Sequence, residues 1–180
     1  MKFVQPIRDK KKLEEVKDVL RRQSYRDLFL FEMGINTGLR ISDLLKLHVN
    51  DVKERTHIVI KEQKTGKDKR FIINTALREK INEYVNGMGE TDCLFASKKT
   101  GKPITRIQAY RIMNGAAEKV GLDEIGTHTL RKTFGYHYYQ KTKDVVMLQT
   151  IFNHSAPSIT LRYIGIQQDE IDKSLEDFSL

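Results

Sequence analysis

The chain has 180 residues, with 32 Lys and Arg against 24 Asp and Glu and a formal net charge of +8. This length predicts one domain, and a hydrophobic content of 39% is enough for a buried core. A single cysteine, Cys93, excludes an internal disulfide and predicts a reducing compartment. The first residues contain no long apolar stretch, so the sequence predicts neither a signal peptide nor a transmembrane helix. The basic surplus suits a polyanionic partner, although many soluble proteins are as basic.

Helical periodicity dominates the first third of the chain. Asp9 is suited to cap a helix whose apolar residues recur every three or four positions: Leu13, Val16, Val19 and Leu20. Residues 28–35 are nearly all apolar and predict a buried helix that ends at Gly38. A short helix is expected at 41–47. The apolar run that contains Cys93 predicts a core position for this thiol, in preference to a nucleophilic role.

Alternating residues at 57–62 and an extended run at 70–73 predict a β-hairpin with a turn-rich tip at 64–68. Thr75 and Thr105 are expected to cap two helices that end at Gly87 and Gly121. The second of these is expected to bury one stripe: Ile107, Tyr110, Met113, Ala117 and Val120. Further helices are expected at about 128–141, 144–153, 157–164 and 167–176. The predicted fold is therefore mainly α with a small antiparallel β-sheet (α+β).

Two arginines stand in places that suit an anion. Arg40 follows the turn at Gly38 and lies between apolar residues, so it needs a carboxylate or a phosphate. Asp43 is the alternative partner, and it could also hold Arg40 for an incoming phosphate. His128 and Arg131 share one face of a helix that Thr127 is expected to cap, at the end where the helix dipole favours an anion.

The environment of the second arginine leaves one alternative open. Gly135 lies further along the same face and would let a backbone approach closely. The alternative is a surface basic helix with a half-buried histidine.

The hairpin tip and the last third of the chain supply the other reactive groups. The tip carries four basic residues in a stretch of seven, which suits insertion toward a DNA groove: Lys64, Lys67, Lys69 and Arg70. Tyr163 follows His154 by nine residues, and its phenol could attack a phosphate that the arginines hold. The alternative for Tyr163 is a core stripe with Ile159 and Ile166, with His154 satisfying a helix end.

Taken in order, these residues resemble the catalytic domain of the tyrosine recombinases, the phage integrase family. Residues 37–45 resemble the family's first arginine motif, 128–131 the second, and 152–163 the third with its nine-residue gap. Lys64-Thr65-Gly66 matches the family's hairpin lysine. The likeness spans about residues 5–172.

Two departures from the family pattern are visible. Phe152-Asn153 stand where the family often has Leu-Gly, and Asn tolerates a left-handed backbone. The chain also begins where the catalytic domain would begin, without the N-terminal core-binding domain. We therefore expect residues 1–180 to be a single catalytic domain cut from a longer protein, with a naturally short relative as the alternative.

The resemblance implies a site-specific DNA recombinase or integrase that cleaves and rejoins strands through a 3′-phosphotyrosyl link to Tyr163. Arg40 and Arg131 would hold the phosphate, with Asp43 supporting them. His128 would act as general base, Lys64 would protonate the leaving 5′-oxygen, and His154 would donate a hydrogen bond. No metal and no cofactor are expected. Further DNA contacts are expected from Lys67, Lys69, Arg70, Lys143 and Arg162.

The implied partner is double-stranded DNA, bound by a homo-oligomer that is a tetramer on DNA, with a monomer in isolation as the alternative. Such a protein is expected in the cytoplasm at the nucleoid, with no membrane partner. Four residues after Tyr163 could contact a neighbouring copy or fold back on their own domain: Ile164, Ile166, Ile171 and Leu175. The rival functions are a type IB topoisomerase-like strand-relaxing enzyme and a DNA-binding or regulatory relative that does not recombine.

Overall fold

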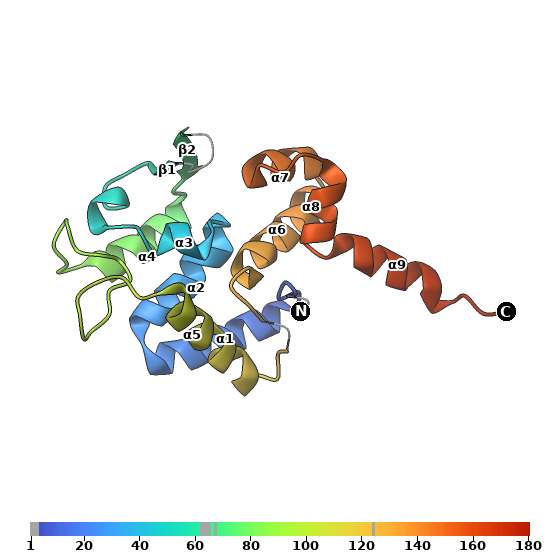
Figure 1. The fold of residues 1–180 in the computed structure, drawn as a ribbon, viewed down its shortest axis with the longest axis horizontal. Helices are drawn as coiled ribbons and strands as arrows, with labels where there is room; N and C mark the ends of the chain where they lie inside the picture. The colour runs from blue at the N-terminus through green and yellow to red at the C-terminus, as the bar shows by residue number, and fades with distance from the viewer. Residues whose placement is uncertain (1–3, 62–65, 67, 124) are drawn as a thin grey trace.

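A computed structural model describes residues 4–61, 66, 68–123 and 125–180. Figure 1 shows most helices gathered in one body, a small sheet at its upper edge, and α9 (Ile166–Glu176) extending away from it. The sheet of the described residues has two antiparallel strands, so the predicted mainly α fold with a small antiparallel sheet is confirmed.

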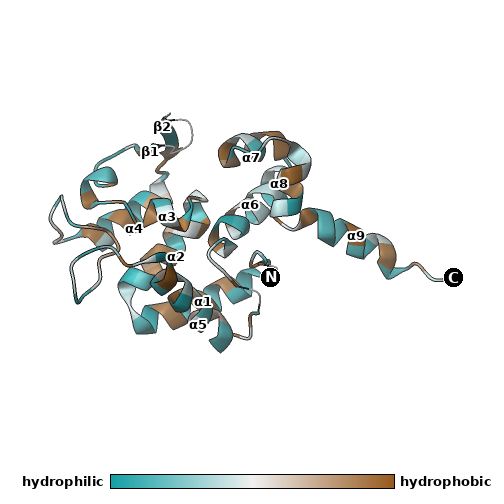
Figure 2. Ribbon diagram, viewed as in Figure 1, coloured by the Kyte–Doolittle hydropathy of each residue, from teal (hydrophilic) through white to brown (hydrophobic). Residues whose placement is uncertain are grey.

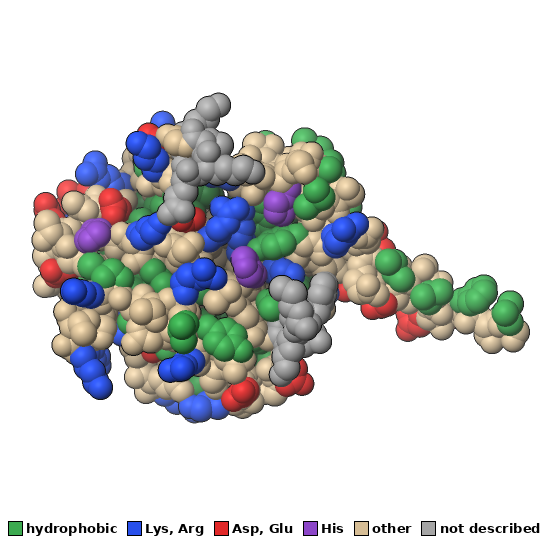
Figure 3. Space-filling view, viewed as in Figure 1, with side chains coloured by type: hydrophobic (Ala, Val, Ile, Leu, Met, Phe, Trp, Pro, Cys, Tyr) green, Lys and Arg blue, Asp and Glu red, His purple; other side chains and the backbone are tan. Residues whose placement is uncertain are grey.

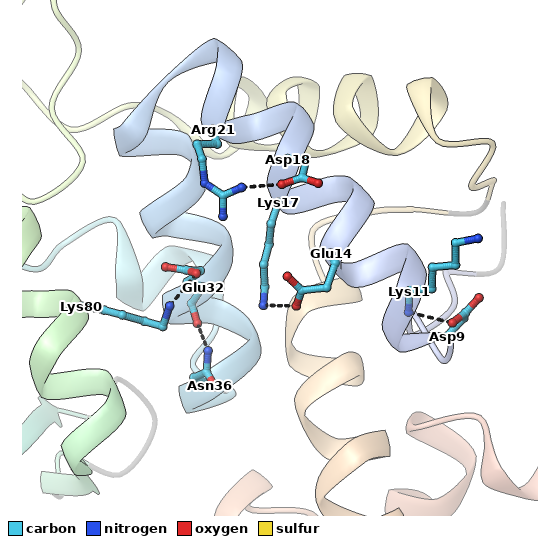
Figure 4. Close-up of polar contacts among 9 residues, drawn as sticks. All are labelled: Asp9, Lys11, Glu14, Lys17, Asp18, Arg21, Glu32, Asn36 and Lys80. Carbon is cyan, nitrogen blue, oxygen red and sulfur yellow. Dashed lines mark hydrogen bonds and ion pairs between the residues drawn. The ribbon is translucent and has the colours of Figure 1, made fainter.

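Helix α1 (Lys10–Gln23) begins as predicted, because the Asp9 carboxylate accepts a hydrogen bond of 2.8 Å from the Lys11 backbone N–H. Its apolar stripe is buried, and Figure 2 shows the alternation of apolar and polar residues along the helices of this body. Its outer face carries the ion pairs Lys17–Glu14 and Arg21–Asp18 (Figure 4).

Helix α2 (Tyr25–Thr37) crosses the centre of the body and packs against α1, α4 and α6. Its apolar residues are buried, and it ends at Gly38 in the left-handed conformation, as predicted. Glu32 is buried, and its carboxylate forms an ion pair of 2.8 Å with the Lys80 ammonium of α4 (Figure 4). This central helix therefore delivers the chain to Gly38 with little freedom to shift.

Helix α3 (Ile41–Leu44) is shorter than the predicted 41–47. The backbone beyond it is taken by another segment, because the Leu47 carbonyl accepts from the Leu94 N–H at 2.9 Å. A 3-10 turn follows at Val49–Asp51. Cys93 is half-buried beside the fully buried Leu94, so its side chain lies at the edge of the core.

Strands β1 (His57–Lys61) and β2 (Asp68–Ile72) pair antiparallel, with His57 opposite Ile72, which confirms the predicted hairpin. Helix α4 (Thr75–Val85) follows directly. Its N-cap is Asn74 and not the predicted Thr75, because the Asn74 side chain accepts from the Leu77 N–H at 2.9 Å.

Helix α5 (Arg106–Lys119) has the predicted Thr105 cap, closed by a reciprocal bond from Gln108. The predicted core stripe is wrong at its start, since Ile107 is 64% exposed and Tyr110 is 41% exposed. The buried face is instead made mostly of small residues that let α5 lie close to α1: Ala109, Met113, Ala116 and Ala117. The periodic pattern predicted burial of the larger apolar side chains, whereas close packing of the two helices buries the smaller ones.

The last third forms the four predicted helices: α6 (Thr129–Thr142), α7 (Val145–Phe152), α8 (Pro157–Tyr163) and α9. They share a second apolar cluster made by Leu148, Phe152, Ile164 and Ile166. Leu130 of α6 belongs to the larger first cluster. Helix α6 therefore joins the two parts of the molecule.

Close approach of α2 and α6 depends on glycine. A Cβ at Gly34 would lie 2.5 Å from a Leu130 methyl carbon, and one at Gly38 would lie 2.4 Å from the Phe134 ring. The sequence analysis expected a backbone to approach Gly135. Instead, the side chains of Phe152 and Ile164 pack against it. These contacts set the separation of the two helices that carry the arginine motifs.

Gly34→Ala is expected to destabilise the protein by about 1–3 kcal/mol, because the added methyl group overlaps Leu130 in a packed core. Urea unfolding monitored by circular dichroism measures this change. The matched control is Gly115→Ala within α5, where the new methyl group meets no heavy atom within 4 Å beyond its own stretch of helix. That change should stabilise the protein by up to about 1 kcal/mol; an equal effect of both substitutions would contradict the packing argument.

Candidate active site

Arg131 is the most enclosed charge of the site. Its side chain is 4% exposed, with Nη1 donating to the Gly38 carbonyl at 2.5 Å and Nη2 to the Phe152 carbonyl at 3.0 Å. The guanidinium carbon also lies 4.1 Å from the centroid of the Phe152 ring. Two carbonyl bonds use two of the five N–H donors of the group, and the remaining donors face the Tyr163 hydroxyl and the space for an anion.

Arg40 and Arg131 line one pocket. Its volume is about 470 Å³, and Asp43 lines it as well. Within the described residues the exposed Arg40 side chain makes no hydrogen bond or ion pair, so the predicted alternative pairing with Asp43 is not formed. The two arginines, 91 positions apart in the chain, therefore converge on one space, as the sequence predicted.

Other cations surround this pocket. Lys69 of the hairpin lines it, and its Nζ donates to the Ile151 carbonyl of α7, so the hairpin and α7 meet across the pocket. Lys61 and Arg106 line it as well. Figure 3 shows Lys and Arg side chains gathered with histidines in the middle of one face of the molecule. The pocket therefore offers an anion several positive charges and one carboxylate.

His128 takes the N-cap position of α6, which the sequence analysis assigned to Thr127. Its side chain makes no capping bond and instead has Nδ1 3.4 Å from the Tyr163 hydroxyl, at the long end of a hydrogen bond. The Gly126 N–H bonds the Thr129 hydroxyl at 2.9 Å, which satisfies this turn locally. The imidazole is thus left to face the phenol.

Tyr163 is the last residue of α8 and is half-buried. Its ring stands edge-on to His154 with centroids 5.1 Å apart, and to Phe152 at 5.6 Å. The alternative core stripe is wrong, because Ile159 is 41% exposed. Tyr163 therefore lies between the two histidines and not in a continuous apolar face.

His154 lies between α7 and α8 and is held by a side chain of α8. Its Nδ1 lies 3.0 Å from the hydroxyl of the fully buried Thr160. When that hydroxyl donates to Nδ1, the neutral ring carries its proton on Nε2 and can donate it. The preceding Asn153 adopts a φ of 56°, which confirms the expected left-handed backbone at this position.

Burial and the positive charges of the pocket shift the pKa values of four groups at this site. Burial lowers the pKa of His128, and the cations Lys132, Arg106, Arg131 and Arg40 lower it further. Burial and the nearby Arg131, Arg40 and Lys69 likewise lower the pKa of His154. Burial raises the pKa of Tyr163, with Arg131 and Arg40 opposing it. Burial also lowers the pKa of Arg131 to about 10, so this group stays charged at neutral pH.

The predicted DNA-contacting residues divide by position. Arg70 is exposed on β2, where it lines a neighbouring pocket with His57, and Arg162 is exposed on α8. Lys143 ends α6 at the end opposite His128, so it lies away from the arginine pocket. Lys64 and Lys67 lie outside the described residues.

Sequence reasoning missed two cations near the reacting groups. Arg106 was hidden by the wrong core stripe of α5, although its place directly after the Thr105 cap marks a helix N-terminus. Lys132 follows Arg131 directly, and its Nζ lies 5.0 Å from the centroid of the Tyr163 ring. Adjacent residues on a helix point about 100° apart, so no face pattern indicated this contact.

Two features are not found in the part of the chain that the structure describes. No group of three or more His, Cys, Asp or Glu side chains is placed to hold a metal ion. None of its helices combines the length and the apolar character needed to span a membrane.

Several solved structures share this fold. The crystal structure of XerA recombinase matches with a TM-score of 0.76 at 18% identity, over 97% of this chain and 65% of that one. XerH recombinase bound to a palindromic difH substrate in a post-cleavage complex matches with a TM-score of 0.72 at 18% identity, over 98% of this chain and 54% of that one. A lambda integrase dimer bound to a COC′ core site matches at 0.71 and 17%, over 92% and 61% of the two chains.

Sequence comparison then gives the family. The model described as "Phage integrase family" matches residues 8–170. A probable integrase/recombinase of Bacillus subtilis, YoeC, is 56% identical over 94% of this chain and 93% of its own length. The tyrosine recombinase XerD of Corynebacterium glutamicum is 29% identical over 86% of this chain, which spans only 53% of that relative. The chain therefore belongs to the phage integrase family, as a tyrosine-type site-specific recombinase.

The free protein should show a His128 pKa below the ordinary value of 6.5, because burial and neighbouring cations both favour the neutral ring. An NMR titration of the imidazole C–H signals measures it. Arg106→Gln should move the midpoint upward, since it removes a nearby positive charge, whereas Arg21→Gln in α1 should not. A midpoint above 6.5 in the unaltered protein would contradict this account.

Proposed function

We propose that the chain cleaves and rejoins double-stranded DNA through a 3′-phosphotyrosyl link to Tyr163. The observation that carries the proposal is the convergence of Arg40 and Arg131 on one pocket beside the phenol and the two histidines. The similar XerH recombinase was solved on a difH substrate and the similar lambda integrase on a COC′ core site, and both complexes support DNA as the partner here.

The arginines hold the reacting phosphate. Arg131 keeps further N–H donors and its charge after its two carbonyl bonds, and Arg40 has its side chain in the same pocket. Together they offset the charge that builds on the non-bridging oxygens in the transition state. One such donor contributes about 3–4 kcal/mol in comparable anion sites, so either arginine serves rate more than affinity. Asp43 lines the same pocket without pairing with Arg40, so its supporting role would begin when a phosphate draws the guanidinium inward.

The histidines manage the phenol and the phosphate. Neutral His128, with Nδ1 facing the Tyr163 hydroxyl, accepts the phenolic proton as oxygen attacks phosphorus. The bond to the 5′-oxygen breaks, and Lys64 protonates this leaving group. His154 donates from Nε2 to a phosphate oxygen, with Thr160 fixing its ring. The phosphotyrosine keeps the energy of the broken DNA bond. The 5′-hydroxyl of another strand then attacks this phosphorus and releases Tyr163, which reverses the steps.

Cations around the pocket hold the flanking backbone. Lys69, Arg70 and Arg162 lie on the hairpin and on α8. Lys67 belongs to the hairpin sequence, and Lys143, at the far end of α6 from the arginine pocket, would contact backbone further from the reacting phosphate. Because such contacts release counterions from DNA, they make binding depend on salt without reading its sequence.

Tyr163→Phe should bind DNA as the unaltered protein does but form no covalent adduct with a nicked suicide substrate, because only the hydroxyl is removed. Denaturing gel electrophoresis detects the adduct, and a filter or shift assay measures binding. Tyr139→Phe in α6 serves as the matched control, since it removes a hydroxyl outside the arginine pocket. Adduct formation by Tyr163→Phe would rule out this residue as the nucleophile. Relaxation of supercoiled DNA without exchange between paired sites would favour the topoisomerase-like rival.

The exposed side of α9 supports the proposal that copies of the chain associate. Ile164 and Ile166 fold into their own domain, at 0% and 4% exposure, which decides one of the alternatives left open by the sequence. Ile171 and Leu175 are 45% and 57% exposed on the helix that leaves the body (Figure 1). We propose that this apolar side contacts a second copy of the chain when DNA brings copies together, up to a tetramer.

Replacing both Ile171 and Leu175 by Glu should abolish assembly of several copies on DNA while leaving adduct formation on a single site intact. Light scattering after size-exclusion chromatography measures the assembly. Ser174→Glu, a charge added at a polar position of the same helix, is the control and should assemble normally. Unchanged assembly of the double variant would exclude α9 as the contact.

A further inference from the structure

The segment from Val4 to Arg8 lies against the helices that carry the reacting groups. The Ile7 N–H donates to the Thr133 hydroxyl at 2.9 Å, and the Ile7 carbonyl lies 2.9 Å from Nε2 of His137. Ile7 is almost fully buried. Residues 4–8, here called the N-terminal strap, are thereby fixed along one side of α6.

Lys132 joins this strap to the proposed nucleophile. Its nearly buried side chain donates from Nζ to the Val4 carbonyl at 2.8 Å. The same Nζ lies 5.0 Å from the centroid of the Tyr163 ring, within range of a cation–π interaction. A cation with little access to water, fixed by a backbone carbonyl, therefore stands over one face of the phenol ring.

Arg8 holds the chain just after Tyr163. Its Nε and Nη2 donate to the two carboxylate oxygens of Asp169 at 3.0 and 2.8 Å, a bidentate pair. Nη2 also lies 3.5 Å from the Gly165 carbonyl, and Nη1 donates to Gln5 at 3.1 Å. Gly165 makes the left-handed turn between α8 and α9, with a φ of 83°. The turn that ends the tyrosine helix is thus tied to the strap.

We propose that Lys132 and Arg8 are positioning residues for Tyr163, and that the N-terminal strap sets the place from which the phenol attacks. This rests on the proposed function, in which Tyr163 is the nucleophile. Neither residue touches the reacting atoms: one holds the ring face and the other holds the turn that follows the ring. Loss of either contact lets the hydroxyl move away from His128 and from the phosphate, which lowers rate more than affinity.

The test uses the 180-residue protein and a nicked suicide substrate at saturating concentration. The single-turnover rate of adduct formation is measured beside the DNA dissociation constant. Lys132→Met keeps the length of the side chain and removes its charge, and it should slow adduct formation by about 10- to 100-fold with little change in DNA affinity. Lys132→Arg keeps the charge and should recover part of the rate. Lys17→Met is the matched control, because Lys17 pairs with Glu14 at 2.7 Å on the outer face of α1, and its loss should leave the rate unchanged.

A charge exchange tests the second contact and guards against misfolding. Arg8→Glu and Asp169→Arg should each slow the reaction, and the double variant should restore it to within about threefold of the unaltered rate. The proposal is overturned if Lys132→Met and both single reversals react at the unaltered rate, or if the double variant is no faster than the single ones. An unaltered protein that forms no adduct overturns the proposed function itself, and the role of the strap with it.

Discussion

The buried guanidinium of Arg131, held by the ends of two helices, is the interaction on which the site depends. Gly38 caps the end of α2 and Phe152 is the last residue of α7, so both carbonyls belong to helix ends that lack intrahelical partners. These ends carry partial negative charge, which stabilises a cation without cancelling it as a carboxylate would. Arg131 can therefore be deeply buried and still present nearly its whole charge to an anion. The same contact joins the larger core to the smaller one around α7 and α8.

The charge kept in this way also sets the state of the neighbouring groups. Burial lowers the pKa of His128 and His154, and the Lys and Arg side chains of the pocket lower it further, so both rings are neutral at cellular pH. A neutral imidazole can accept a proton, which a phenol with a raised pKa needs when it attacks. One field thus serves two purposes: it attracts the phosphate, and it keeps the base of the reaction unprotonated.

Much of this arrangement could be predicted from the sequence. Periodic apolar residues, caps such as Asp9 and Thr105, and the glycine that ends α2 marked the helices within a few residues. The order of Arg40, His128, Arg131, His154 and Tyr163 indicated the pocket, because a phosphate needs those groups together. Tertiary packing decided what could not be predicted. Small residues form most of the buried face of α5, so Ile107 is exposed and Arg106 lines the pocket. The contact of Lys132 joins residues far apart in the chain and leaves no local pattern.

The apolar side of α9 has a consequence for the way this molecule responds to its solution. Association through exposed Ile171 and Leu175 would be strengthened by salts such as sulfate, which raise the cost of keeping apolar surface in water. Attraction between the arginine pocket and a polyanion weakens in the same solutions, because released counterions lose their entropic advantage. Self-association and capture of the nucleic acid should therefore have opposite salt responses, and the complete assembly should be most abundant at an intermediate ionic strength.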